Sequence, residues 1–174
     1  MRYALIYGGI AGAIVISIIV TSVALTMPSH VTSEWFGYLV MLVALSLIFV
    51  GVKRYRDVEC GGVIKFGTAL TLGLAIAAVA SLVYVVGWEI YIAASGHDFI
   101  SDYTAMVVKE MRAEGATPAA VQSKLTEMND LAAQYKNPLF RIPITFVEIF
   151  PVGLLVALIS AALLRNSTLL PATR

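Results

Sequence analysis

The chain has 174 residues, of which 59% are hydrophobic and only 13% are charged, with a formal net charge of +1. Its mean hydropathy is +0.86. Ordinary soluble domains carry about 25% charged residues, so the composition excludes that class of protein. The apolar residues occur in four long runs, and these predict an all-α membrane protein with four transmembrane helices in a single domain.

The first run predicts a transmembrane helix over 3–27, because no charged side chain lies between Arg2 and Glu34. A cleaved signal peptide is the alternative, but the apolar core exceeds the roughly 7–15 residues of such peptides and no A-x-A site follows. Within this helix Gly8 and Gly12 form a G-x-x-x-G motif, which lets helix backbones approach closely. The neighbour is either another helix of this chain or a second copy, so a homo-oligomer through these glycines is one expectation.

Two further runs predict transmembrane helices over 35–52 and 66–92. The connection between them is basic, whereas the connection 28–34 has no lysine or arginine; the basic residues are Lys53, Arg54, Arg56 and Lys65. The positive-inside rule therefore places 53–65, and with it both termini, in the cytoplasm. Aromatic residues expected at the outer interface agree with this orientation, and they are Trp35, Phe36, Tyr38, Trp88 and Tyr91.

The segment 93–137 predicts an amphipathic helical insertion outside the membrane, built as a helical hairpin. Its first helix is expected over 99–114, with Asp98 or Ser101 as N-cap and Gly115 just past its end. Thr117 and Pro118 predict the N-cap and first position of the second helix. That helix has a narrow apolar seam at spacings of four and three, formed by Val121, Leu125, Met128, Ala132 and Tyr135. The Asn137-Pro138 pair is expected to end it.

The last run predicts a transmembrane helix over 142–164 in which Glu148 is the single charged residue. The apolar residues of the run contribute roughly −4 to −8 kcal/mol to insertion, and a central acidic residue costs only about 2.5 to 3.5 kcal/mol. The helix is therefore expected to insert. Pro151 follows three residues later and cannot donate to the carbonyl of Val147, so a kink is expected there.

Charged groups in the spans define a candidate polar cluster. Glu89 lies near the outer end of the third predicted helix, and Arg141 opens the fourth at the same surface. Glu148 lies about 10 Å deeper at 1.5 Å per residue. These three residues are expected to line one outward-facing cavity, and Trp88 and Pro151 complete the candidate cluster. A Glu–Arg or Glu–Tyr hydrogen-bonded clasp is the first interpretation, a ligand, lipid or proton site is the second, and catalysis is the third and weakest.

Other chemistry is sparse. Cys60 is the single cysteine, so no disulfide can form within the chain, and no nucleophile or phosphate-loop motif occurs. His30 and His97 are both expected on the outer side near Glu89, but their spacing matches no metal-ligand motif. The chain is therefore expected to bind no metal, no cofactor and no nucleic acid.

Several longer stretches resemble the bacterial membrane proteins grouped as domain-of-unknown-function family 4199. The resemblance covers essentially the whole chain and is carried by GVKRYRD at 51–57, GGVIKFG at 61–67, WEIY at 88–91, NPLFRIP at 137–143 and TFVEIFPVG at 145–153. It implies a four-helix protein of the bacterial inner membrane. It implies no activity.

Two classes of function remain. The favoured one is a non-enzymatic scaffold or accessory protein, a four-helix bundle that binds membrane lipids or a membrane partner. The alternative is a small transporter or channel-like protein that uses Glu148 and Glu89 as a proton or cation site. Glu148 beside a helix-breaking proline favours transport, whereas four helices enclose little cavity unless the protein oligomerises, and no inverted repeat is apparent.

Overall fold

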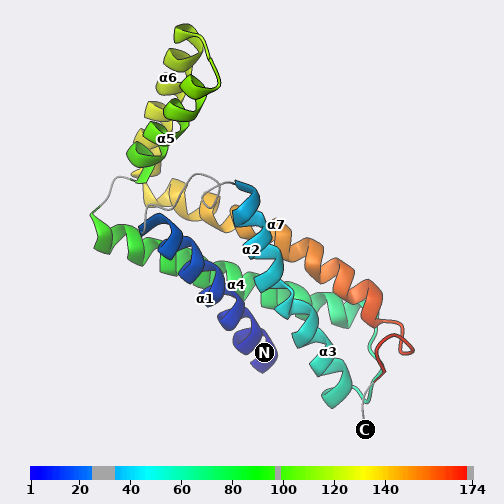
Figure 1. Ribbon diagram of the computed structural model, residues 1–174. Coiled ribbons are helices and arrows are strands. Elements are labelled where there is room, and N and C mark those ends of the chain that lie inside the picture. Colours follow the sequence, from blue (N-terminus) through cyan, green and yellow to red (C-terminus); the bar gives the residue numbers. More distant parts are fainter. Residues whose placement is uncertain (25–33, 97–98, 172–174) are drawn as a thin grey trace. The chain divides into compact units, whose positions relative to one another are not determined.

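The computed structural model describes residues 1–24, 34–96 and 99–171, and these residues form helices joined by turns, with no strand among them. Figure 1 shows the helices in chain order. They are α1 (Arg2–Ala24), α2 (Glu34–Leu45), α3 (Leu47–Glu59), α4 (Phe66–Ser95), α5 (Phe99–Ala113), α6 (Pro118–Tyr135) and α7 (Pro138–Leu164). The chain divides into two compact units: unit 1 is Met1–Trp88 with Thr145–Arg174, and unit 2 is Glu89–Ile144.

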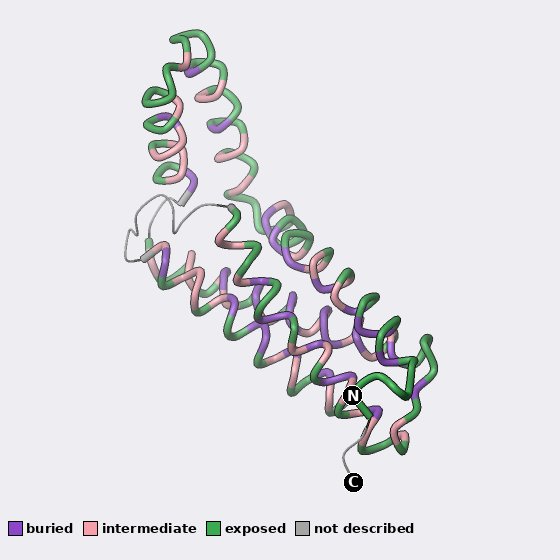
Figure 2. The backbone as a smooth tube through the Cα atoms, turned by 45° about the vertical axis from the view of Figure 1, so that its right-hand side comes forward, coloured by how far each residue is buried: buried purple, intermediate pink, exposed green. Residues whose placement is uncertain are grey.

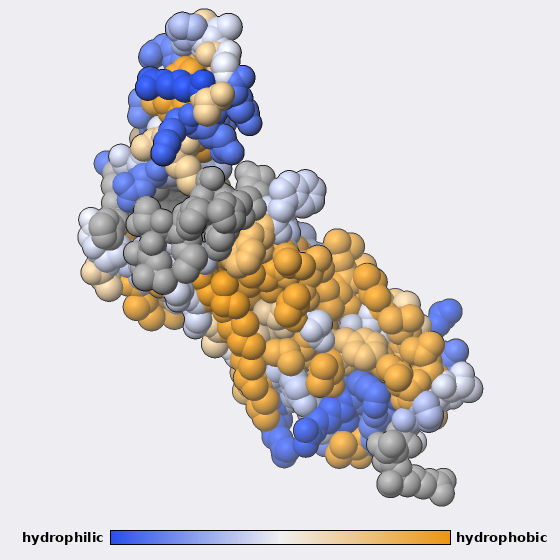
Figure 3. Space-filling view, viewed as in Figure 1, coloured by the Kyte–Doolittle hydropathy of each residue, from blue (hydrophilic) through white to orange (hydrophobic). Residues whose placement is uncertain are grey.

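In the described residues, four helical stretches are long and apolar enough to cross a membrane: Arg2–Val23, Trp35–Glu59, Phe66–Ser95 and Pro138–Leu164. Each of the four predicted spans falls on one of them. The part of the first prediction beyond Ala24, and most of the connection 28–34, lie outside the described residues. In Figure 3 the visible surface along the helices of unit 1 is mostly hydrophobic, and hydrophilic residues gather where α3 ends.

The second span is longer than predicted and is interrupted at one residue. Ser46 separates α2 from α3, and its hydroxyl donates to the carbonyl of Val43 at 2.6 Å, a local bond that competes with regular helix geometry. The prediction ended at Val52, but the helix continues to Glu59. The predicted end was wrong for a physical reason. The end of an apolar run marks where a chain leaves the hydrocarbon of the membrane, and a helix can continue beyond that point. The i,i+4 ion pair between Lys53 and Asp57 supports the extra turns.

The fourth span also begins earlier than predicted. Pro138 is the first residue of α7, and the side chain of Asn137 accepts from the backbone N–H of Leu139 at 3.0 Å, which caps the helix. The helix then runs without interruption through Pro143 and Pro151 to Leu164. Pro151 therefore removes one backbone donor without ending the helix.

Small residues bring the helices of unit 1 close together, with α4 as the common neighbour. A Cβ atom built on Gly8 or Gly12 of α1 would lie 2.6 or 2.5 Å from the carbonyl oxygens of Ile76 and Ala80 in α4. No side chain fits there, so the G-x-x-x-G motif packs α1 on α4 of the same chain. This is the first of the two alternatives that the sequence left open. Homo-oligomerisation itself stays a prediction.

The same kind of contact joins α4 to α7. Gly73 of α4 faces Ala157, and Gly153 of α7 faces Ala77, with hypothetical Cβ atoms 2.9 and 2.8 Å from the facing methyl carbons. Figure 2 shows the buried residues along the sides where the helices of unit 1 meet. Close backbone approach through small residues is the usual basis of helix association in membranes, where apolar burial drives little between helices.

Unit 2 contains α5 and α6, which pack against each other. The predicted seam of α6 is correct: Val121 and Met128 are buried, and the other three seam residues are half-buried. Thr117 caps α6 as predicted, accepting from the N–H of Ala120 at 3.3 Å, and Gly115 follows α5 with φ 81°. Ser101 lies inside α5, so it is not the cap, and Asp98 lies outside the described residues.

Candidate functional site: two carboxylate clasps

Glu89 and Arg141 form a bidentate ion pair in unit 2. Glu89 lies in the last two turns of α4 and Arg141 in the first turn of α7. The Nε of Arg141 donates to one carboxylate oxygen of Glu89 at 2.7 Å, and Nη2 donates to the other at 2.5 Å. Two parallel charge-assisted bonds of this kind fix geometry as well as energy. The pair therefore ties the end of α4 to the start of α7.

Tyr135 completes the surroundings of Arg141. The Nη1 of Arg141 donates to the backbone carbonyl of Tyr135 at 3.0 Å, and the guanidinium lies 5.6 Å from the centre of the tyrosine ring. All three guanidinium nitrogens thus have partners, and Arg141 is only 9% exposed. Tyr135 was expected only as part of the apolar seam of α6. The sequence did not predict its contact with Arg141. Tyr135 makes that contact through its backbone carbonyl and the face of its ring, and no pattern of charged residues indicates either.

Glu148 belongs to a second clasp, in unit 1. The hydroxyl of Tyr84 lies 3.4 Å from each of its carboxylate oxygens, a long and shared hydrogen bond. Tyr84 is buried at 2% exposure, whereas Glu148 itself is exposed on α7. Strong O–H···O bonds are about 2.5–3.0 Å, so Tyr84 is a weak partner for a carboxylate. Sequence reasoning foresaw a glutamate–tyrosine clasp in general but did not identify Tyr84.

The predicted cluster therefore resolves into two local pairs. The structure brings Glu89 together with Arg141, and Glu148 together with Tyr84. The first pair belongs to unit 2 and the second to unit 1, so a single cavity lined by both stays a prediction. Of the other two candidates, Trp88 is buried in unit 1 and Pro151 is exposed on α7.

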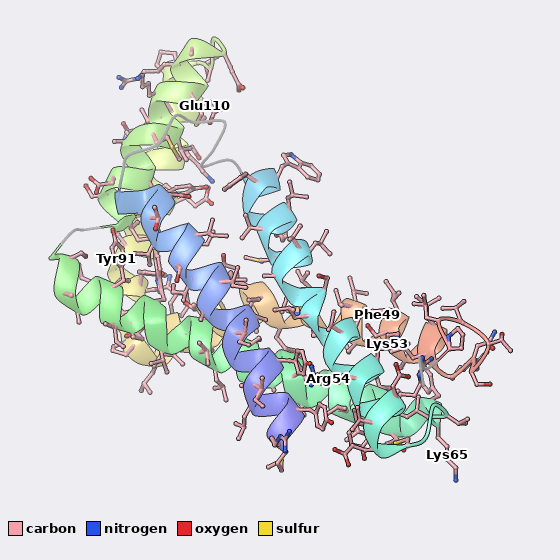
Figure 4. The ribbon with its side chains drawn as sticks, turned by 60° about the horizontal axis from the view of Figure 1, so that its bottom comes forward. Phe49, Lys53, Arg54, Lys65, Tyr91 and Glu110 are labelled. Carbon is pink, nitrogen blue, oxygen red and sulfur yellow. The ribbon has the colours of Figure 1, made fainter. Side chains whose placement is uncertain are left out.

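A further polar site lies at the end of α3, in unit 1, and the sequence did not predict it. Arg56 has no exposed surface, and its Nε donates to Asp57 at 2.7 Å. Its Nη1 and Nη2 donate to the carbonyls of Leu169 and Leu170 at 3.1 and 2.5 Å, so it holds the segment that follows α7. The other basic residues of this region, Lys53 and Arg54 on α3 and Lys65 before α4, are labelled in Figure 4.

The structure offers no metal centre in the residues that it describes, where no group of three His, Cys, Asp or Glu side chains converges. His30 and His97 lie outside those residues, so the prediction about them stays untested. Cys60 is half-buried, with a free thiol. Arg54 and Lys65 are exposed, as expected of residues in a basic connection.

Comparison with known proteins identifies a family. The model of a family described as "Protein of unknown function (DUF4199)" matches residues 2–166, nearly the whole chain. No curated protein and no solved structure matches the chain.

Proposed function

The chain belongs to the DUF4199 family, and we propose that it is a non-enzymatic integral membrane protein, a scaffold or accessory protein that binds lipid or a membrane partner. The observation that carries the proposal is the Glu89–Arg141 clasp. A transport or catalytic site needs charged groups that are free to take up a ligand, whereas Arg141 uses all three guanidinium nitrogens within the protein. Its role is to join helices.

The clasp lies at the base of the α5–α6 pair, because Glu89 precedes α5 and Arg141 follows α6. This ion pair joins the end of α4, which leads into α5, to the start of α7, which follows α6. The surface of α5 and α6 is largely exposed, with charged residues such as Glu110 of α5, which is labelled in Figure 4. The α5–α6 pair is polar and exposed, and the ion pair joins the two apolar helices that flank it in the chain. Such a pair offers a suitable surface for binding a partner.

The proposed setting is the bacterial inner membrane, crossed four times, with both termini in the cytoplasm and the α5–α6 pair outside as a helical hairpin. The support is the distribution of basic residues. Arg54 and Lys65 are exposed beside the connection between the second and third spans, and Arg2 and Arg165 are exposed at the start of the first span and just after the fourth. Positive charge of this kind is retained on the cytoplasmic side.

Native mass spectrometry of the purified protein, released from nanodiscs of bacterial lipid, tests the proposal. The expected spectrum shows the chain with retained phospholipid, a second protein, or both, and the retained mass persists at collision energies that strip detergent. Glu110→Gln, on the exposed surface of α5, is the matched control for Arg141→Gln, which should reduce the retained mass by disturbing the base of the pair. Bare monomer under all conditions contradicts the proposal.

Transport is the second candidate, and the exposure of Glu148 favours it. A carboxylate in an apolar span with one weak hydroxyl partner is available to bind a proton or a cation. Proteoliposomes with an internal pH dye test this directly. A proton or sodium flux that Glu148→Gln abolishes and Glu110→Gln leaves unchanged supports transport. Absence of flux in the unmodified protein eliminates it.

A further inference from the structure

We propose that the outer face of α7 around Glu148 binds a transmembrane helix of another protein, and that this helix carries a basic side chain at the depth of Glu148. The inference rests on the proposed function and names the chemistry of the partner. The face is one side of the helix, defined by Val147, Glu148, Pro151, Leu155 and Ile159.

These residues form a continuous exposed strip. Pro151, Leu155 and Ile159 follow the Val147–Glu148 pair at helical spacings of three and four. Val147, Leu155 and Ile159 are each about 60% exposed (61, 59 and 59%). The opposite side of α7 is fully buried, at Ile149 and Ala157. The strip is therefore the side of α7 that the other helices of unit 1 leave uncovered. Apart from Glu148 it is apolar.

Glu148 has an unfilled capacity for hydrogen bonds. A carboxylate offers about four lone-pair positions, and Tyr84 supplies one hydrogen, from a hydroxyl oxygen that lies 3.4 Å from each carboxylate oxygen. Glu148 lies ten residues after Pro138 and sixteen before Leu164, well inside the span. Hydrocarbon has no water to fill the remaining positions, and ionisable groups at such depth normally face a protein partner. An exposed carboxylate there is complementary to a donor of positive charge.

A second copy of the chain does not supply that charge. The lysines and arginines in the described parts of the spans lie near the span ends: Arg2 opens the first, Arg141 opens the fourth, and Lys53, Arg54 and Arg56 fall in the last turns of the second. None lies at the depth of Glu148. The occupant is therefore a different protein, and its helix carries Lys, Arg or His near its middle.

Designed transmembrane peptides test this in vesicles. The probe is a Leu/Ala helix of about 20 residues with one central lysine, and its control has leucine at that position. The protein carries a fluorescent donor on Cys60, its single cysteine, and each peptide carries an acceptor. The lysine peptide is expected to bind about three- to tenfold more tightly than the leucine peptide, as one interhelical polar contact allows.

Two variants assign the preference to this face. Glu148→Gln should remove the advantage of the lysine peptide, and Glu110→Gln should keep it. Leu155→Trp retains Glu148 but blocks the strip, and it should lower binding of the lysine peptide at least threefold. Equal binding of both peptides to the unmodified protein overturns the inference. So does an unchanged preference in Glu148→Gln, or unchanged binding of the lysine peptide to Leu155→Trp. Retained lipid in native mass spectra would then leave the proposed function standing without this partner.

Discussion

Arg141 binds both carboxylate oxygens of Glu89, 52 residues earlier in the chain, while its third nitrogen holds the carbonyl of Tyr135. One side chain thus connects the end of α4, where unit 2 begins, with the end of α6 and with the start of α7, where unit 2 ends. The arrangement leads to the first prediction.

Arg141→Gln is expected to lower the free energy of unfolding by about 1.5–3 kcal/mol, because it removes two charge-assisted bonds and leaves Glu89 without its counter-charge. The measurement is a sodium dodecyl sulfate titration in mixed micelles, followed by circular dichroism. Glu110→Gln, which changes an exposed carboxylate, should stay within about 0.5 kcal/mol of the unmodified protein.

A double-mutant cycle with Glu89→Gln separates the pair from its surroundings. If the clasp acts as a unit, the double variant costs clearly less than the sum of the two single changes. Simple additivity would show that Arg141 and Glu89 stabilise the protein independently, which the bidentate geometry does not allow.

The glycines of α1 give the second prediction. Gly12→Ala should destabilise the protein by about 1–3 kcal/mol, because its Cβ would lie 2.5 Å from the carbonyl oxygen of Ala80 and α1 would have to move away from α4. Gly9→Ala is the matched control, three residues away in the same helix, where a Cβ meets nothing within 4 Å. It should be neutral or slightly stabilising, since alanine favours helix over glycine. Equal effects at both positions, in the same titration, would contradict the packing of α1 on α4.

Arg56 gives the third prediction. Arg56→Gln removes the guanidinium that holds the carbonyls of Leu169 and Leu170, so the segment after α7 should detach. Each lost bond to a charged group is worth about 1.5–3 kcal/mol, so carboxypeptidase should remove residues from this end at least about tenfold faster. Mass spectrometry of timed digests measures the rate. Arg54→Gln, which changes an exposed neighbour, should leave the rate unaltered, and an unchanged rate in Arg56→Gln would show that the segment is held elsewhere.

The sequence predicts the apolar helices well, because a long uncharged run is what a helix in hydrocarbon requires. It also predicts Thr117 as an N-cap and Gly115 as the residue after a helix, because helix ends depend on local residues. It predicts side-chain partners poorly. Tyr84 lies 64 residues before Glu148 and looks like one more residue of an apolar run, while Arg56 meets a carbonyl 113 residues away. Such contacts depend on how helices are rotated against each other, and that rotation is set by packing of small residues such as Gly73 on Ala157.

Orientation is the fourth prediction, and thiol labelling measures it. Cys60 follows α3 at the basic end of unit 1. In intact cells a membrane-impermeant maleimide should leave Cys60 unmodified, because positive charge holds that end in the cytoplasm, and it should react once the cells are opened. In a Cys60→Ser background, Ser123→Cys on the exposed surface of α6 should react in intact cells. Each position serves as the control for the other, because in intact cells the reagent should label the cysteine at position 123 and should not label Cys60. Labelling of Cys60 in intact cells, or protection of the cysteine at position 123, would contradict the proposed orientation.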